Sequence, residues 1–146
     1  MTADELIQAL DLIPHPEGGW YRETWRAEAA EGERPAASAV YYVIQPGQRS
    51  QWNRVDAHEM WLWHAGDPVD LGIAESDSRP SRTVRLGGRV TEGEHPQLII
   101  PTGYWQSAEP APGGENGYSL ISCIVAPAFE FSGYELAEPG WAPGQG

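Results

Sequence analysis

The sequence predicts an all-β fold, a barrel or sandwich of short strands preceded by one short N-terminal helix. Three observations lead to this prediction. Short runs of aromatic and β-branched residues recur along the chain, clusters of Gly, Pro, Asp and Ser separate these runs, and only the first residues follow a helical period. About ten short runs at regular intervals are typical of a sandwich or a barrel.

The helix is predicted from its start signal and its apolar spacing. Thr2 and Glu5 have the capping-box spacing, with Thr2 as N-cap and Glu5 as the third helical residue. Apolar residues between Leu6 and Leu10 then recur at helical spacing. The first proline that follows, Pro14, lacks the N–H that a helix interior needs, so we expect the helix to end before it.

The remaining chain is expected to form one barrel with no linker long enough to divide it. The predicted organisation is an N-terminal helical segment at 1–14, a barrel at 15–138 and a flexible tail at 139–146. The expected strands lie at 19–26, 38–45, 50–55, 58–64, 69–75, 82–86, 97–100, 104–108, 118–125 and 130–136.

Composition excludes several classes of protein. The chain has 146 residues and a net charge of −12, and all nine of its cations are arginines. An acidic chain without a basic patch is a poor nucleic-acid partner, because that affinity depends on phosphate neutralisation. The lack of lysine excludes Schiff-base and pyridoxal-phosphate chemistry.

Location is predicted from features that the chain lacks. It has no apolar run of about 20 residues that would suit a membrane span, and no signal-peptide pattern. The single cysteine, Cys123, fits a reducing compartment. We therefore expect a cytoplasmic protein that contacts neither membrane nor nucleic acid.

One motif narrows the fold. Gly47, Asn53, Val55, Glu59 and Gly66 follow one another at a spacing that resembles the first motif of the cupin superfamily. In that motif histidines occupy the positions held here by Asn53 and Val55. The glycines permit tight turns, and alternation along a strand directs every second side chain to the same face.

Further segments resemble the DUF985 (Cupin_5) family in the right order. They include residues 12–23, 50–61, 125–131 and the run from Pro101 to Gln106, which resembles the second cupin motif. The resemblance implies a cupin jelly-roll β-barrel, a homodimer, and a fold similar to that of sugar-nucleotide epimerases. The chain departs from the family pattern at Asn53, where a histidine is usual, and at His58, where an acid is common.

The resemblance also bears on metal binding. Metal cupins usually hold their ion with three imidazoles and a carboxylate, and the equivalent positions here are Asn53, Val55, Glu59 and Gln106. Valine cannot coordinate, and amide oxygens are poor ligands for transition metals. His58 precedes Glu59 on a predicted strand, so the two point to opposite faces. We therefore predict no metal and no cofactor.

Glu59 and His58 are the candidate catalytic residues. Burial of Glu59 in an aromatic-lined barrel would raise its pKa and suit it to acid/base work. The alternative for Glu59 is a structural pair with an arginine such as Arg54. His58 could carry protons near neutral pH, or it could be an ordinary surface histidine.

The candidate ligand-binding residues fall into three chemical groups. Amides could orient a polar ligand or only satisfy one another, aromatic side chains could stack on a ligand or form core, and a charged pair could meet an anionic group or only each other. These groups are Gln51, Asn53 and Gln106; Trp61, Trp63 and Tyr104; and Arg22 with Glu23.

Three functions are consistent with these residues. The first is a metal-independent isomerase, epimerase or cyclase that uses a carboxyl group inside the barrel on a small molecule. The second is a binding protein for a sugar-like or nucleotide-sugar-like molecule without turnover. The third is a metal-dependent oxygenase or lyase, which the ligand positions disfavour.

Overall fold

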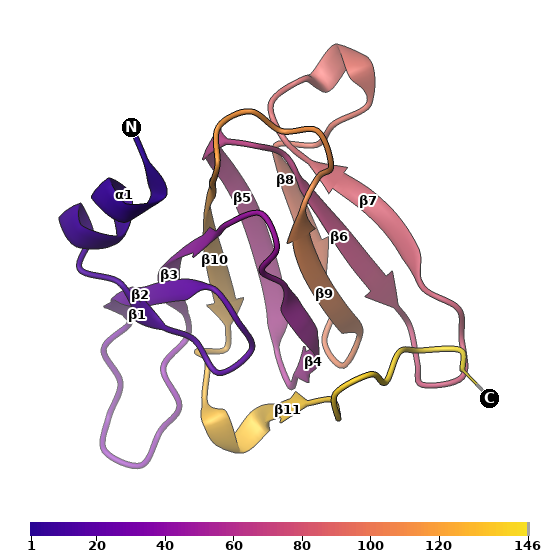
Figure 1. Cartoon of the computed structure of the whole chain (residues 1–146). Helices are drawn as coiled ribbons and strands as arrows, with labels where there is room; N and C mark the ends of the chain where they lie inside the picture. The colour runs from indigo at the N-terminus through magenta and orange to yellow at the C-terminus, as the bar shows by residue number, and fades with distance from the viewer. Residues whose placement is uncertain (146) are drawn as a thin grey trace.

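The computed structural model describes residues 1–145, in which one α-helix, eleven strands and two short 3₁₀ helices alternate (Figure 1). Their bounds are α1 (Ala3–Ala9), β1 (Ile13–Pro14), β2 (Trp20–Arg26), β3 (Ser38–Ile44), β4 (Ser50–Val55), β5 (His58–Gly66), β6 (Val69–Ala74), β7 (Arg82–Leu86), η1 (Val90–Glu92), β8 (Gln97–Ile100), β9 (Trp105–Pro110), β10 (Ser119–Ala126), η2 (Phe131–Gly133) and β11 (Tyr134–Leu136).

The strands form two antiparallel sheets that face each other, as the predicted jelly roll requires. One sheet has the order β1-β2-β3-β10-β5-β8 and the other has the order β11-β4-β9-β6-β7. Figure 1 shows β11, near the C-terminus, beside β4 at the lower edge, where it pairs through Tyr134 with Val55. The all-β prediction is confirmed, and segments far apart in sequence meet at this edge.

The strand predictions differ from the structure mainly at the two ends of the chain. The two-residue strand β1 was not predicted, because two residues that include a proline carry no alternating pattern. The expected strand at 130–136 is instead the 3₁₀ turn η2 followed by the three-residue strand β11. The other expected strands lie within about two residues of their predicted bounds.

The helix begins as predicted. The Thr2 side chain accepts a hydrogen bond from the Glu5 backbone N–H at 3.2 Å. Helix α1 ends at Ala9, before the prolines, because Asp11 turns the chain through a left-handed conformation with a φ of 55°. Leu6 is buried against Val43 of the six-stranded sheet, which fixes the helix on the outside of the barrel.

Apolar side chains fill only one end of the space between the sheets. Ile44, Val69, Leu86 and Ile121 are completely buried at that end. At the other end, strand β4 pairs Asn53 with Gln106 of β9, and these are buried polar residues. The barrel therefore has one solid apolar end and one polar end.

The segment after β11 packs on the barrel. Trp141 lies against Trp105, with ring centroids 4.5 Å apart, and the Gly144 N–H donates to the Asp77 carbonyl at 2.8 Å. The prediction of a flexible tail at 139–146 overlooked this aromatic contact, which holds the segment as far as the structure describes it. Residue 146 lies outside the described residues.

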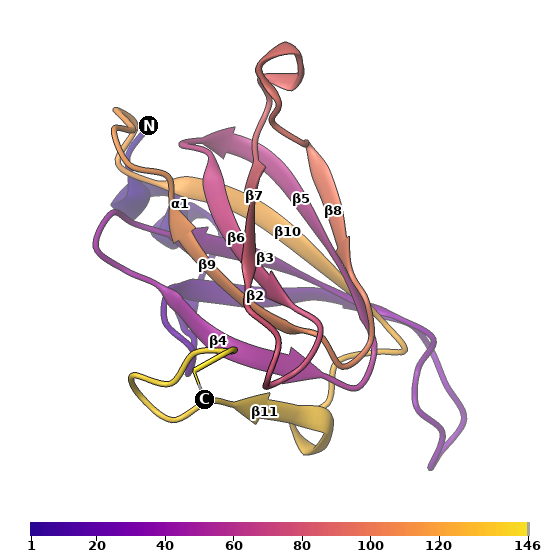
Figure 2. The same ribbon diagram turned by 90° about the vertical axis from the view of Figure 1, so that its right-hand side faces the viewer.

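Two loops project from opposite ends of the barrel. The loop between β2 and β3 extends from one end, and the loop that carries η1, between β7 and β8, extends from the other (Figure 2). Within residues 1–145, no helix has the length and apolar character needed to cross a membrane.

A Gly-Gly turn connects β1 to β2 and positions the residue that precedes it. Gly18 and Gly19 have φ values of 107° and 79°, which side-chain-bearing residues rarely adopt. A Cβ on Gly18 would lie 2.1 Å from the Arg49 carbonyl oxygen. Only glycine therefore allows the turn to pass this close to β4, and the turn brings Glu17 to the barrel.

Gly18→Ala should destabilise the protein much more than Gly32→Ala. Both glycines have positive φ, but nothing lies within 4 Å of a Cβ on Gly32. We expect a loss of about 1 kcal/mol for Gly32→Ala and about 3 kcal/mol or more for Gly18→Ala, since the latter adds a clash with backbone. Urea unfolding measures both. Equal losses would contradict the close approach to Arg49.

Candidate functional site

A cavity of about 550 Å³ opens at the polar end of the barrel. Its walls come from β2, β3, β4, β5, β9 and β10, and its mouth from the segments around β1 and η2. Two of the carboxyl groups that line it, those of Glu17 and Glu59, lie with the amides of Asn53 and Gln106. Strands of both sheets thus contribute side chains to one cavity.

A continuous chain of hydrogen bonds joins the two carboxyl groups. Gln106 Nε2 donates to Glu59 Oε1 at 2.7 Å and to Asn53 Oδ1 at 3.0 Å. Asn53 Nδ2 in turn donates to Glu17 Oε2 at 2.7 Å. The two amides therefore link residues of β5, β9 and β4 to the turn that precedes β2.

Trp61 fixes the direction of this chain. Its indole N–H can only donate, and it donates to Gln106 Oε1 at 2.9 Å. The Gln106 oxygen must therefore face Trp61, which leaves the NH₂ group for Glu59 and Asn53. Asn53 then turns its oxygen to Gln106 and its NH₂ group to Glu17.

Glu17 lies in an environment that favours its protonated form. Its side chain is only 12% exposed. Burial raises the pKa of Glu17 to about 8, and the negative charge of Glu59 adds to the rise. At neutral pH Glu17 is therefore mainly a carboxylic acid that holds a proton inside the cavity.

Glu59 differs from Glu17 in what surrounds it. Burial also raises the pKa of Glu59, and its hydrogen bonds with Gln106 and Cys123 oppose this rise; unlike Glu17, it has no neighbouring charge that adds to the rise. Glu59 is thus the better candidate for the ionised partner. Two carboxyl groups of unequal acidity at one site are the usual basis for separate acid and base roles.

His15 is neutral and has a defined tautomer. Burial lowers the pKa of His15 to about 4. Its Nδ1 atom accepts the Glu17 backbone N–H at 3.1 Å, so the ring proton resides on Nε2. The ring also lies edge-on to Tyr21, with centroids 4.4 Å apart. His15 therefore offers the cavity a neutral donor.

Two tyrosines complete this end of the cavity. The Tyr134 hydroxyl donates to Glu17 Oε2 at 3.4 Å, and the Tyr42 hydroxyl donates to the Gly18 carbonyl. Burial raises the pKa of both phenols, so they remain protonated donors. They also hold the turn that carries Glu17 against β3 and β11.

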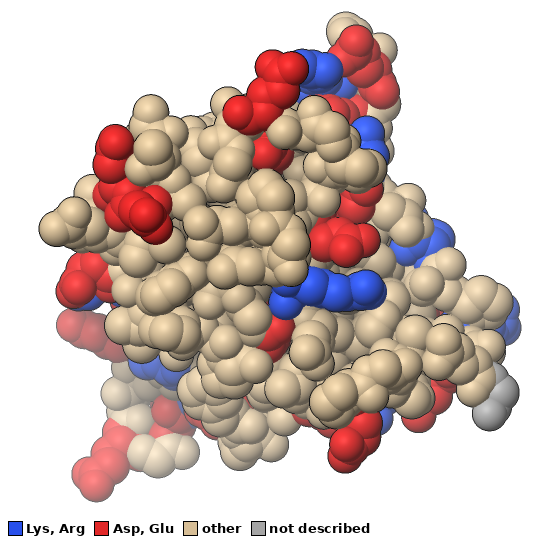
Figure 3. Space-filling model, viewed as in Figure 1, with Lys and Arg blue, Asp and Glu red and all other residues tan. Residues whose placement is uncertain are grey.

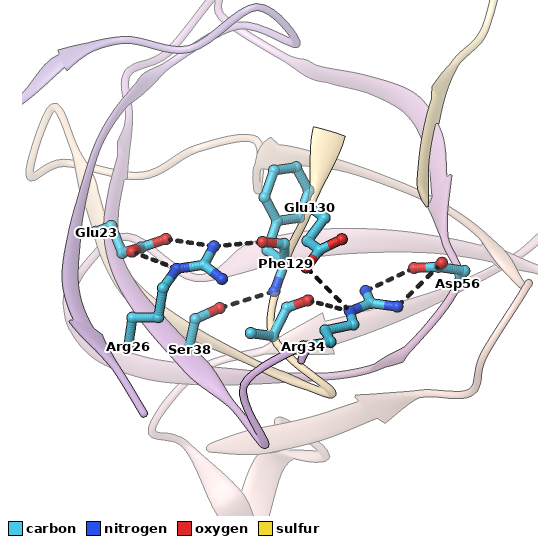
Figure 4. A network of polar contacts seen from close by, with 8 residues as sticks. Glu23, Arg26, Arg34, Ser38, Asp56, Phe129 and Glu130 are labelled. Atoms are coloured by element: carbon cyan, nitrogen blue, oxygen red, sulfur yellow. Dashed lines mark hydrogen bonds and ion pairs between the residues drawn. The ribbon is translucent and has the colours of Figure 1, made fainter. Parts of the chain in front are cut away.

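Arginines hold the mouth of the cavity together (Figure 4). Arg26 pairs with Glu23 at 3.1 Å and also donates to the Phe129 carbonyl. Arg34 donates to the Ala128 carbonyl at 2.8 Å and pairs with Asp56 at 2.7 Å. These contacts fasten the segment after β10 to β2 and to the loop before β3.

The structure brings together only some of the residues predicted for the site. Glu59, Asn53 and Gln106 lie side by side in the cavity. Arg22 and Glu23 lie at its mouth, where Arg22 pairs with Asp11 rather than with Glu23.

Two polar residues predicted for the site, His58 and Gln51, lie outside the cavity. His58 is exposed, and its Nδ1 accepts the Thr102 N–H at 3.2 Å, because it faces away from Glu59 on β5. Gln51 is also exposed. Alternation along the strand predicts that Gln51 shares a face with Asn53, but β4 carries an extra residue relative to β9 between Ser50 and Asn53, which turns Gln51 outward.

The predicted aromatic residues have structural contacts. Trp61 is 1% exposed in the core, where it donates to Gln106 and lies edge-on to Tyr42. Trp63 donates to the Asp67 carbonyl at 3.2 Å, near the other end of β5. Tyr104 packs against the apolar core and does not line the cavity.

The side chains at the cupin metal positions do not fit a metal. The oxygens of Asn53 and Gln106 both accept hydrogen bonds, the first from Gln106 and the second from Trp61. Val55 offers no ligand atom. Among residues 1–145, no group of three His, Cys, Asp or Glu side chains could hold an ion. The donor set instead suits proton chemistry.

The sequence interpretation missed the residues around the Gly-Gly turn. Glu17, His15, Tyr42 and Tyr134 all line the cavity, yet none was predicted as a site residue. A signal for Glu17 exists in the two glycines that follow it, since such a tight turn brings the preceding side chain back towards the sheet. The tyrosines carry no comparable signal, because core tyrosines have the same spacing.

Comparisons with known proteins agree with this geometry. The model of the family described as Cupin superfamily (DUF985), Cupin_5, matches residues 4–137. No curated protein matches the chain.

Several solved structures are similar to the chain. A hypothetical protein from Leishmania major is 36% identical, with a TM-score of 0.82 over 94% of this chain and 88% of that one. A protein from Shewanella oneidensis is 34% identical, with a TM-score of 0.86 over 94% and 85%. A mutant oxalate decarboxylase of Bacillus subtilis is 15% identical, with a TM-score of 0.61 over 84% and 29%, which shows the fold alone.

The raised pKa of Glu17 predicts that stability falls between about pH 6.5 and pH 8. The folded state keeps the Glu17 proton up to about pH 8, whereas the unfolded chain releases it near pH 4.5. Glu17 alone should therefore lower the stability by at most about 1.4 kcal/mol per pH unit as pH rises. His15 has the opposite effect, but only below pH 6.5, since its pKa is lowered from 6.5 to about 4.

Glu17→Gln should flatten this slope, and urea unfolding at pH 6.5, 7.2 and 8 measures it. Glu59 contributes a slope of the same sign, so some dependence remains in the variant. Glu28→Gln, in an exposed loop, should keep the wild-type slope. A wild-type slope that survives in Glu17→Gln would contradict the assignment of a buried proton to Glu17.

Proposed function

We propose that the barrel of this chain, which belongs to the Cupin_5 (DUF985) family of the cupin superfamily, is the active site of a metal-independent enzyme. The proposed reaction class is isomerisation, including epimerisation or cyclisation, of a small molecule by proton transfer. One observation carries the proposal. Glu17 and Glu59 line one cavity, and a single amide chain links them and presents a donor to each.

The proposed roles follow from the two environments. Glu59, as the carboxylate, removes a proton from a carbon next to a carbonyl group. Glu17, as the carboxylic acid, gives its proton to the carbonyl oxygen, so that an enol forms and no charge accumulates on the substrate. Glu59 returns its proton to a different carbon or face while the enol proton returns to Glu17, which regenerates both groups.

The neighbouring side chains support these roles as positioning groups. Asn53 and Gln106 hold the two carboxyl groups in fixed orientations, and Trp61 fixes Gln106. Neutral His15 offers a further hydrogen-bond donor beside Glu17. Such preorganised dipoles favour the charge distribution of a transition state without reorganisation during the reaction.

A binding protein without turnover is the second candidate function. It is favoured by the closed hydrogen-bond network, in which both carboxyl groups already have donors and need no substrate to satisfy them. In that case the buried network serves to shape the cavity. The two candidates differ in whether a proton ever leaves Glu59.

The proposal also covers the ligand class, the oligomeric state and the location of the protein. A small-molecule ligand, rather than nucleic acid, is supported by the surface charge. On the face in Figure 3, acidic groups are spread widely and arginines are isolated from one another. A homodimer and a cytoplasmic location remain predictions, the first from family resemblance and the second from the single buried thiol Cys123.

The chemistry is tested by exchange of acidic C–H protons in deuterated buffer, followed by proton NMR. We expect the wild type to accelerate exchange in 2-tetralone or dihydroxyacetone, one apolar and one polar ketone. Glu59→Gln and Glu17→Gln should each reduce the acceleration at least about 100-fold, the range for a lost acid or base. Glu28→Gln should keep it.

The same experiment separates the two candidate functions. A binding protein gives no exchange above buffer with either ketone, in wild type or in any variant. Acceleration that persists in Glu59→Gln would contradict the proposed base. Circular dichroism of each variant confirms that a lost rate does not reflect unfolding.

A further inference from the structure

The cavity changes in character from its inner end to its mouth. The polar groups described above, Glu17, Glu59, Asn53 and Gln106, occupy the inner end. Beside these polar groups, parts of the cavity wall are aliphatic and aromatic. They are lined by Tyr21, Val40, Val55, Val125 and Phe129.

Apolar side chains also form the outer rim. Ile13 and Phe131 both line the cavity, and yet they are 56% and 57% exposed. Exposed apolar side chains at the edge of a cavity indicate a binding surface more often than exposed apolar side chains elsewhere do. An apolar wall therefore continues from the interior of the barrel to solvent.

The charged groups that line the cavity disfavour an anionic ligand. They comprise two arginines, Arg22 and Arg26, and five carboxyl groups, Asp11, Glu17, Glu23, Glu59 and Glu130. Each arginine is already paired, Arg22 with Asp11 at 2.5 Å and Arg26 with Glu23 at 3.1 Å. No arginine among the lining residues is thus free to receive a phosphate or a carboxylate.

A cationic ligand is disfavoured for a different reason. A buried ammonium group needs an ionised partner to offset its loss of hydration. Glu17 holds its proton at neutral pH, which leaves Glu59 as the single buried carboxyl group that could pair with an ammonium group, and burial disfavours its ionised form. At the mouth, Asp11, Glu23 and Glu130 each lie within 4.0 Å of an arginine, so they are not free partners either.

We propose that the ligand of the barrel is an uncharged, largely apolar small molecule that binds with one hydroxyl or carbonyl group at Glu17 and Glu59. Its apolar body lies along the wall of Val40, Val125 and Phe129, and its far end lies between Ile13 and Phe131. A cavity of about 550 Å³ is in the usual range for such molecules. This inference rests on the proposed function only in placing the polar group of the ligand at Glu17 and Glu59.

Three biphenyl probes of similar shape test the charge preference. They are biphenyl-4-ol, biphenyl-4-yl phosphate and biphenyl-4-ylmethanamine, which are neutral, anionic and cationic at pH 7. Isothermal titration calorimetry with the wild type should give at least about tenfold tighter binding for biphenyl-4-ol than for either charged probe, since a buried unpaired charge is costly. Equal or tighter binding of the phosphate or the amine would overturn the proposal, as would no binding of biphenyl-4-ol.

Two isoleucines provide a matched test of the rim. Ile13 and Ile99 are 56% and 55% exposed, but only Ile13 lines the cavity. Ile13→Ser should weaken biphenyl-4-ol binding about threefold to tenfold through lost apolar contact, whereas Ile99→Ser should leave it unchanged. Equal affinities of the two variants would overturn the assignment of the rim. Urea unfolding shows whether both variants keep the wild-type fold.

These measurements do not depend on catalysis. Preferential binding of biphenyl-4-ol without any C–H exchange would support the ligand class and contradict the proposed enzyme. C–H exchange of dihydroxyacetone together with preferential binding of the phosphate probe would support the proposed enzyme and contradict the ligand class. The two proposals therefore fail separately.

Discussion

The hydrogen bond from the Trp61 indole N–H to the Gln106 side-chain oxygen sets the polarity of the whole site. An indole can only donate, so this contact decides which end of Gln106 faces Glu59. Gln106 in turn decides the orientation of Asn53, and Asn53 that of its partner Glu17. A core tryptophan that does not line the cavity thus specifies which groups of this chain donate and which accept.

This arrangement explains how a cupin barrel dispenses with the usual imidazoles. Buried polar groups need partners, and a set of metal ligands finds them in an ion. Here two amides replace the ion as hydrogen-bond partners. Each amide both donates and accepts, so every polar group along the chain has a partner. The burial that makes Glu17 a weak acid also lowers the stability of the fold. Active sites commonly have this cost, because their residues are selected for function and not for stability.

The sequence predicted the barrel well because strand alternation and turn residues are local signals. The spacing of the motif also selected Glu59, Asn53 and Gln106, and all three line the cavity. Gln51 was misplaced because a bulge in β4 depends on how the strand meets β9 and leaves no mark in the spacing. Glu17 and Tyr134 were missed because 117 residues separate them, and only the closed barrel brings them into contact.

The mouth of the cavity is assembled from the two ends of the barrel sequence. The residues from Asp11 to Arg26 form one side, and the residues from Phe129 to Tyr134 form the other. Arg26 and Arg34 join the two sides through backbone carbonyls near Phe129. A chain that is still being synthesised therefore cannot possess this pocket until Tyr134 has left the ribosome. A ligand of this pocket therefore stabilises only the completed fold, because it contacts both the first strands and the last.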